Sequence, residues 1–135
     1  MAAAREARQN GAAAEAGPDV KRFERPDRRL VFEQGSLEAI KVGGRMIGKG
    51  SYGPGWKWSR AAGGGGLPAH VGVVLSGRAK ARERAGRETD LLPGDCFHLT
   101  TATDLRVVGY RPCEILYVSG VEGLMHKLRF AGAGP

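Results

Sequence analysis

The chain has 135 residues, the length of one ordinary domain, and its formal net charge is +7 at pH 7. Its 22 glycines favour a turn-rich fold over a helical bundle, and its two cysteines, Cys96 and Cys113, are too few for a disulfide scaffold. No apolar run approaches a membrane span, and residues 1–17 interleave Ala with charge instead of forming a signal-peptide core. We therefore expect a cytoplasmic protein with reduced thiols.

The positive charge is unevenly distributed along the chain. Residues 28–135 contain 16 basic and 9 acidic residues, whereas residues 1–27 contain five of each. This distribution excludes a basic tail that grips nucleic acid. The expected partner is a small-molecule ligand, and neither nucleic acid nor a membrane is expected.

The chain divides into an arm, a strand-rich region and a tail. Residues 1–27 have almost no large apolar side chain before Val20 and Phe23, which predicts a disordered N-terminal arm. From residue 28 onward, short apolar runs alternate with Gly and Pro clusters, which is typical of an all-β sandwich or barrel over residues 28–120. Residues 121–135 form a C-terminal tail with a short helix over 121–128. The expected strands are 30–32, 37–42, 45–52, 56–59, 71–75, 78–84, 88–92, 96–99, 105–110 and 114–119.

One hairpin can be assigned a register from its charges. A two-residue loop would place Glu83 opposite Glu88, which repels. A three-residue loop places Arg84 opposite Glu88 and Arg82 opposite Asp90. Opposite charges across a strand pair are favourable, so we predict the three-residue loop.

Three stretches carry a family resemblance. They read Tyr-Gly-Pro-Gly-Trp-Lys-Trp-Ser at 52–59, His-Val-Gly-Val-Val-Leu-Ser-Gly at 70–77 and Leu-Pro-Gly-Asp at 92–95. In this order they resemble the motifs of the cupin superfamily, in particular small single-domain cupins, over residues 28–119. The resemblance implies a double-stranded β-helix, that is, a jelly-roll barrel with a ligand cavity inside, and it makes a homodimer plausible.

The same resemblance locates the metal ligands that cupins carry. The His-x-His element falls in residues 61–68, which contain no histidine, and the following Glu position is occupied by His70. The histidine of the second motif falls near Thr103. At most one of four ligand positions keeps a side chain that binds metal well, so we predict neither a full catalytic metal site nor a cofactor.

A divalent metal in a non-standard site remains the alternative. A catalytic ion needs three or more converging protein ligands, and His70, His98 and Cys96 could supply them. Asp95, Asp104 or Glu114 could add a carboxylate. Cys96 and His98 share one face of their strand, and the sequence does not show which face points inward.

The candidate site residues have both functional and structural interpretations. His70 could act as general acid or base or orient a polar ligand, or it could be a histidine satisfied by backbone. Trp56 and Trp58 could form the aromatic wall of a pocket or part of the core. With His98 and Thr103, they complete the predicted ligand-binding set.

A basic stripe lies on one strand face, because Arg78, Lys80, Arg82 and Arg84 alternate along the chain. Such a stripe could meet phosphates, but no aromatic residue for base stacking occurs between Arg78 and Asp90. We interpret it as a solvated outer face.

Three functions remain open at this point. The first is a barrel that binds a small organic molecule, anionic or neutral, without a full metal site. The second is a cupin-type enzyme, an isomerase, lyase or dioxygenase, that uses His70 as acid–base or metal ligand. The third is a nucleic-acid or regulatory partner module that uses the basic hairpin face.

Overall fold

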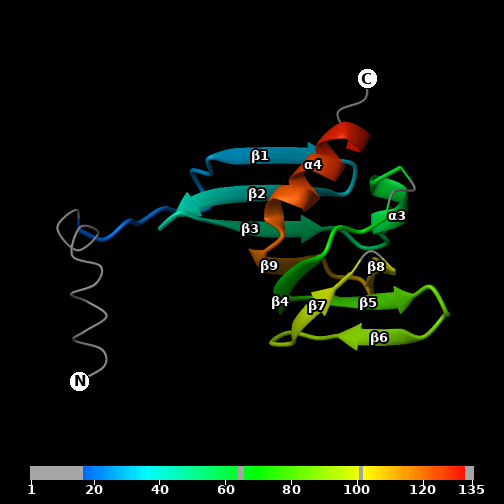
Figure 1. Ribbon diagram of the computed structural model, residues 1–135. Helices are drawn as coiled ribbons and strands as arrows, with labels where there is room; N and C mark the ends of the chain where they lie inside the picture. The colour runs from blue at the N-terminus through cyan, green and yellow to red at the C-terminus, as the bar shows by residue number, and fades with distance from the viewer. Residues whose placement is uncertain (1–16, 64–65, 101, 133–135) are drawn as a thin grey trace.

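The computed structural model describes residues 17–63, 66–100 and 102–132, which form two antiparallel β-sheets and two helices (Figure 1). The larger sheet has the order β1, β2, β3, β9, β4 and β7, and the smaller one has the order β6, β5 and β8. The strands are β1 (Arg28–Phe32), β2 (Gly35–Val42), β3 (Arg45–Tyr52), β4 (His70–Ser76), β5 (Arg78–Glu83), β6 (Glu88–Leu91), β7 (Cys96–Leu99), β8 (Thr103–Val108) and β9 (Cys113–Ser119).

The strands follow from alternating side chains. In β5, Ala79 and Ala81 are buried while Arg78 and Arg82 are exposed, and in β8 Leu105 and Val107 are buried. Alternate residues of a strand point to opposite faces, so each sheet presents one apolar face to the shared core. The expected all-β, double-stranded β-helix architecture is confirmed.

The segment around the two tryptophans differs from its predicted strand at 56–59. Only Lys57 makes a β-bridge, to Arg106, and a short helix α3 (Trp58–Ala61) begins directly after it. The side chain of Asp104 accepts a hydrogen bond from the backbone N–H of Ser59 (3.0 Å), a group that the first turn of a helix leaves unpaired. Trp58 is buried although it begins a helix instead of lying on the predicted strand.

The β5–β6 hairpin has a three-residue loop, but its register differs from the predicted one. Arg82 lies opposite Glu88, and the Glu83 N–H donates to the Arg87 carbonyl (2.9 Å), so the loop consists of residues 84–86. Lys80 lies opposite Asp90. Gly86 has φ +99°, and its N–H donates to the Glu83 carbonyl (2.8 Å). A positive φ at the last position of a three-residue loop favours glycine, so Gly86 favours the observed register over one with Arg87 in that position. The opposite charges across the strands favour it as well.

The C-terminal helix α4 (Val121–Gly132) is longer than predicted and belongs to the core. It crosses β1, β2 and β3 and contacts β1 and β3 (Figure 1). Its buried side chains recur at helical spacing, which forms one apolar stripe. They are Val121, Leu124, Met125 and Leu128. No helix within the described part of the chain is long and apolar enough to cross a membrane.

The predicted arm lies only partly within the described residues. Residues 1–16 fall outside them, and residues 17–27 contain no helix or strand. Asp27 accepts hydrogen bonds from Lys21 Nζ (2.8 Å) and from the Lys41 backbone N–H (2.7 Å), and Asp19 accepts one from the Gly43 N–H (2.9 Å). The two bonds to Asp27, first that from Lys21, lower the pKa of its carboxyl group. Residues 17–27 are thus attached to β2 and the β2–β3 turn.

Candidate functional site

Four aromatic rings form a continuous cluster at one side of the barrel. Tyr52, at the end of β3, stacks on Trp56 with ring centroids 4.1 Å apart. Phe32 lies 6.2 Å from Tyr52 and 6.4 Å from Trp56, and the ring of Trp58 meets Trp56 edge-on at 6.4 Å. Offset-stacked and edge-on arrangements are the favourable ones for aromatic pairs, so these ring contacts stabilise the cluster.

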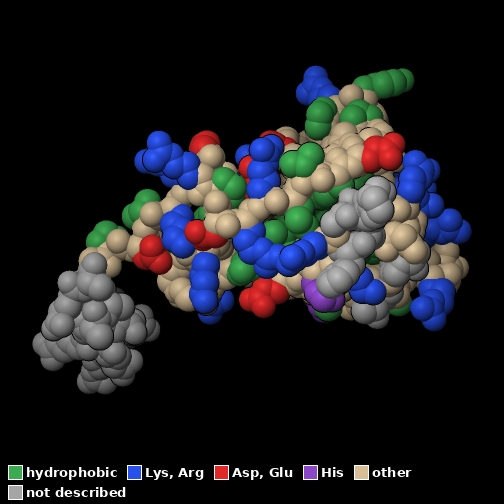
Figure 2. Space-filling view, turned by 90° about the horizontal axis from the view of Figure 1, so that it is seen from above, with side chains coloured by type: hydrophobic (Ala, Val, Ile, Leu, Met, Phe, Trp, Pro, Cys, Tyr) green, Lys and Arg blue, Asp and Glu red, His purple; other side chains and the backbone are tan. Residues whose placement is uncertain are grey.

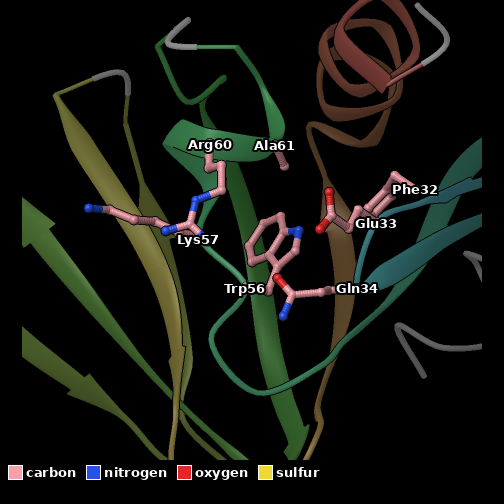
Figure 3. Close-up of a pocket in the computed structure, with 7 residues that line it drawn as sticks. All are labelled: Phe32, Glu33, Gln34, Trp56, Lys57, Arg60 and Ala61. Carbon is pink, nitrogen blue, oxygen red and sulfur yellow. The ribbon is translucent and has the colours of Figure 1, made fainter. Parts of the chain in front are cut away.

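A cleft of about 260 Å³ opens beside this cluster, between α3 and the β1–β2 turn. We call it the Trp56 cleft. Figure 3 shows Trp56 at its centre, with Lys57 and Arg60 on one side and Glu33 and Gln34 on the other. Phe32 and Ala61 complete the lining.

The walls of the Trp56 cleft are held by local backbone contacts. Gln34 has φ +65°, a left-handed conformation that is uncommon for a residue other than glycine. Its carbonyl accepts a hydrogen bond from the Gly53 N–H (2.7 Å), and its side chain donates to the Pro54 carbonyl (3.1 Å). These bonds join the β1–β2 turn to the loop that leads to Trp56.

The charges around the Trp56 cleft are only partly balanced. Lys57 Nζ lies 3.8 Å from Oδ2 of Asp104, a residue that does not line the cleft, so the charge of Lys57 is partly balanced from outside. Arg60 is exposed and makes no ion pair with any of the described residues. Glu33 is the single acidic residue among the described residues of the lining. The Arg60 side of the cleft is therefore positive and the Glu33 side negative.

His70 lies at the start of β4 and is 2% exposed. Its Nδ1 lies 2.8 Å from the Pro68 carbonyl, and because a carbonyl oxygen only accepts, Nδ1 carries the proton. Desolvation lowers the pKa of His70 and favours the neutral ring, so Nε2 carries a lone pair. Within the described residues Nε2 has no hydrogen-bond partner.

His70 is connected to the aromatic cluster through a tyrosine pair. Its ring packs edge-on against Tyr117 (5.3 Å between centroids) and Phe97 (5.9 Å). The hydroxyl groups of Tyr52 and Tyr117 are 2.7 Å apart and fully buried, and burial raises the pKa of both. Ring contacts, together with this hydrogen bond, therefore connect Trp58 to His70.

Gly120 fixes the position of His70. It has φ +78°, and a Cβ there would lie 2.3 Å from the Ala69 carbonyl oxygen and 2.6 Å from His70 Cβ. Only glycine adopts this conformation readily and leaves room for the backbone to approach so closely. The contact holds the first residue of β4 against the end of β9.

The structure does not bring the predicted site residues into one cavity. Trp56 lines the Trp56 cleft, whereas Trp58 and the half-buried Thr103 line a second cleft of about 270 Å³. His70 belongs to the lining of neither. His98 is exposed on β7, because Phe97 and Leu99 take the inward face of that strand.

The alternative metal site lacks its geometry. Cys96 and His98 point outward from β7, while His70 points inward from β4. Among the described residues, no group of three or more His, Cys, Asp and Glu side chains could hold a metal ion. The side chains in the described part of the chain therefore do not form the converging ligand set that a divalent metal needs.

The basic stripe lies on the outer face of the smaller sheet, as interpreted. Lys80 lies 3.7 Å from Asp90, and Arg106 of β8 lies 3.1 Å from Glu88. Arg84 is part of the hairpin loop, not of the strand. Elsewhere on the surface, the face seen in Figure 2 shows Lys and Arg side chains that are spread out, with Asp and Glu between them.

Several residues of this region were not identified from the sequence. Arg60, Glu33 and Gln34 meet at Trp56 only because α3 and the β1–β2 turn are adjacent in space. Tyr52 and Tyr117 lie 65 positions apart in sequence, on neighbouring strands. The sequence indicates only that both tyrosines point inward from their strands. Every core residue shares this property, so it does not identify the pair.

The two facing sheets, with their crossed strand order, have the cupin fold. The structure is similar to ectoine synthase from P. lautus, with 11% sequence identity and a TM-score of 0.55 over 79% of this chain and 84% of that one. It is similar to the polyketide cyclase RemF from Streptomyces resistomycificus, with 14% sequence identity and a TM-score of 0.52 over 73% of this chain and 77% of that one. It is also similar to a sugar phosphate isomerase from a cupin superfamily from Silicibacter pomeroyi, with 14% sequence identity and a TM-score of 0.52 over 67% of this chain and 68% of that one. No protein-family model matches the sequence, and no curated protein matches it significantly.

Proposed function

We propose that this chain binds a small organic acid in the Trp56 cleft. The observation that carries the proposal is Arg60, whose exposed guanidinium group lines the cleft beside Trp56 and makes no ion pair with a described residue. A guanidinium group binds a carboxylate through two parallel hydrogen bonds, and an aromatic ring supplies apolar contact next to it. Arg60 thus provides the charged contact, and the half-buried ring of Phe32, with the small exposed part of Trp56, provides the apolar contact that an organic acid needs.

The opposite wall restricts the ligand further. Glu33 repels a second carboxylate and attracts a donor or a cation, and the exposed Gln34 side chain, whose amide donates to Pro54, offers its oxygen as an acceptor. A ligand with an acid at one end and a hydrogen-bond donor at the other complements both walls. Proteins of the same fold named as a synthase, a cyclase and an isomerase support a small organic ligand.

Tryptophan fluorescence tests this proposal directly, because the chain has two tryptophans. In a Trp58→Phe variant, Trp56 is the remaining fluorophore. We expect hydroxy acids or amino acids from a screening panel to change its emission saturably and to raise the melting temperature. Arg60→Gln should weaken binding about tenfold or more, the loss of one charge-assisted bidentate pair.

The matched control is Arg87→Gln, which removes the same charge from the β5–β6 turn and should leave binding unchanged. If no acid in the panel shifts either signal, or if Arg60→Gln binds as tightly as the unmodified protein, the cleft is not the binding site.

A second candidate function, a cupin-type enzyme, rests on the tautomer of His70. A neutral imidazole whose Nδ1–H is held by the Pro68 carbonyl presents an unprotonated Nε2, the form that a general base requires. His70 lines neither cleft, and its link to the Trp56 cleft is the tyrosine pair: Tyr117 packs against the imidazole ring and is hydrogen-bonded to Tyr52, which stacks on Trp56. We infer that, if the chain catalyses a reaction, His70 moves the proton.

Nitrogen NMR of the imidazole ring tests this inference. An unprotonated Nε2 resonance at pH 7 that shifts when a Trp56-cleft ligand is added would support it. His70→Asn keeps a donor for Pro68 and removes Nε2, so it should abolish any turnover of that ligand while the protein stays folded. An Nε2 resonance that ignores the ligand, together with full turnover by His70→Asn, would exclude His70.

A further inference from the structure

A separate cleft of about 400 Å³ lies where β5 begins and β8 ends. We call it the Arg78 cleft. Its lining includes Arg78, Pro93, Tyr110 and Arg111, which come from three segments that are far apart in the sequence. It shares no residue with the Trp56 cleft and has no part in the function proposed above.

The Arg78 cleft is strongly positive. Arg78 and Arg111 are both exposed, and neither makes an ion pair with any residue that the structure describes. The described residues of its lining contain no Asp or Glu. Two other cations of this sheet, Lys80 and Arg106, are paired with acids, while Arg82, near the opposite end of β5, makes no ion pair with a described residue. Two unpaired guanidinium groups at one cleft form a site for a phosphate, which they can bind in a bidentate manner.

Tyr110 adds an aromatic surface to this charge. Its side chain is 99% exposed, in the turn between β8 and β9. The basic stripe of β5 has no aromatic residue of its own, and the fold supplies Tyr110 at the Arg78 end of that stripe. A fully exposed ring next to unpaired arginines is the combination on which nucleotide bases stack while their phosphates are neutralised.

Gly109 keeps Arg78 beside this turn. Arg78 lies opposite Val108 in the β5–β8 ladder, and its Nη2 lies 3.0 Å from the position that a Cβ would take at Gly109. Gly109 also has φ +85°, a conformation that suits glycine. The missing side chain therefore leaves room for the guanidinium group of Arg78 next to Tyr110.

We propose that the Arg78 cleft binds a nucleotide, with its phosphate between Arg78 and Arg111 and its base on Tyr110. A free mononucleotide and a nucleotide within a single strand share this chemistry. The apolar contribution of Pro93 extends the surface available to the base.

The experiment uses the full chain at about 20 mM salt with two probes: AMP by calorimetry, and a fluorescein-labelled 12-residue oligo-dT by anisotropy. We expect saturable binding of at least one probe. Arg78→Gln should weaken it about tenfold and, for the oligonucleotide, reduce the slope of log K against log salt by about 0.7. Tyr110→Ala should weaken binding about fivefold or more, and Tyr110→Phe should retain it.

The control is Arg129→Gln on α4, which removes one exposed arginine outside the cleft and should change affinity little. Binding of AMP identifies a free nucleotide as a ligand, and binding of oligo-dT alone identifies a single strand; both support the site. Absence of binding by either probe, equal affinity of Arg78→Gln and Arg129→Gln, or full affinity of Tyr110→Ala would overturn the proposal. A concentration-dependent dimer that Tyr110→Ala dissociates would assign the cleft to a second copy of the chain and overturn it as well.

Discussion

The hydroxyl groups of Tyr52 and Tyr117 lie 2.7 Å apart in the interior of the barrel, and each is the hydrogen-bond partner of the other. Tyr52 ends β3, and Tyr117 lies on the adjacent strand β9. The ring of Tyr52 covers Gly50, where a Cβ would lie 2.5 Å from its Cζ, so only glycine leaves room for the ring at this position. The pair joins the aromatic cluster of the Trp56 cleft to the packing around His70.

Removing both of these hydroxyl groups should cost less stability than the sum of the losses from removing each one alone. Tyr117→Phe leaves the buried Tyr52 hydroxyl without a partner, which costs about 1–3 kcal/mol of unfolding free energy. The double variant Tyr52→Phe/Tyr117→Phe leaves no unpaired group at this position, so its loss should be smaller than the sum of the two single losses. Urea denaturation of the four proteins measures this coupling, and strictly additive losses would contradict it.

His70 should make the stability of the protein fall in mild acid. Burial lowers its pKa in the folded state, whereas the unfolded chain has a histidine pKa of about 6.5. Below that pH the unfolded chain binds a proton that the folded protein does not, so stability decreases as the pH falls from about 6.5 toward the lower folded pKa. Above pH 7 this residue should contribute no pH dependence.

The measurement is the urea midpoint between pH 7.5 and pH 5, compared with that of His70→Asn. The variant keeps a donor for the Pro68 carbonyl and lacks the titrating ring, so its curve should be flatter in this range. Identical pH dependence in both proteins would assign the effect to other groups.

The sequence predicted the barrel well because its signals are local. Alternation of Ala with Arg and Lys in β5, and glycine-containing turns between short apolar runs, depend only on neighbouring residues. The helix at Trp58 could not be recognised in this way. Its first turn is stabilised by Asp104, which lies 45 residues further along the chain.

The candidate site was less predictable, since its composition depends on which segments meet. The resemblance to cupins pointed to Thr103, and metal-ligand chemistry pointed to His98, but the face on which a residue lies depends on strand register. His98 is exposed because Phe97 and Leu99 fill the inward positions of β7. Arg60 carried no signal in sequence, and it lines the Trp56 cleft only because α3 lies close to the β1–β2 turn.

The two cysteines should differ sharply in reactivity. Cys96 is exposed, whereas Cys113 is buried and desolvation raises the pKa of its thiol to about 11. Because the thiolate is the reactive form, a disulfide reagent at pH 8 should modify one thiol per folded chain and two in urea. Cys96→Ser should abolish the reaction in the folded state. Rapid modification of two thiols in the native protein would show that the region around Cys113 opens.

Gly120 should be among the positions least tolerant of substitution. Its φ of +78° is unfavourable for alanine, and a Cβ would overlap the Ala69 carbonyl oxygen and His70. Gly44 has a similar φ of +76° with open space around it, so Gly44→Ala provides a matched control for the conformational effect alone. We expect Gly44→Ala to cost about 1–2 kcal/mol of unfolding free energy, the penalty of a left-handed conformation. Gly120→Ala should cost about 3 kcal/mol or more, because β4 must move away from the end of β9. Urea denaturation of both variants checks this difference, and equal losses would show that the contact between Gly120 and His70 does not constrain the barrel.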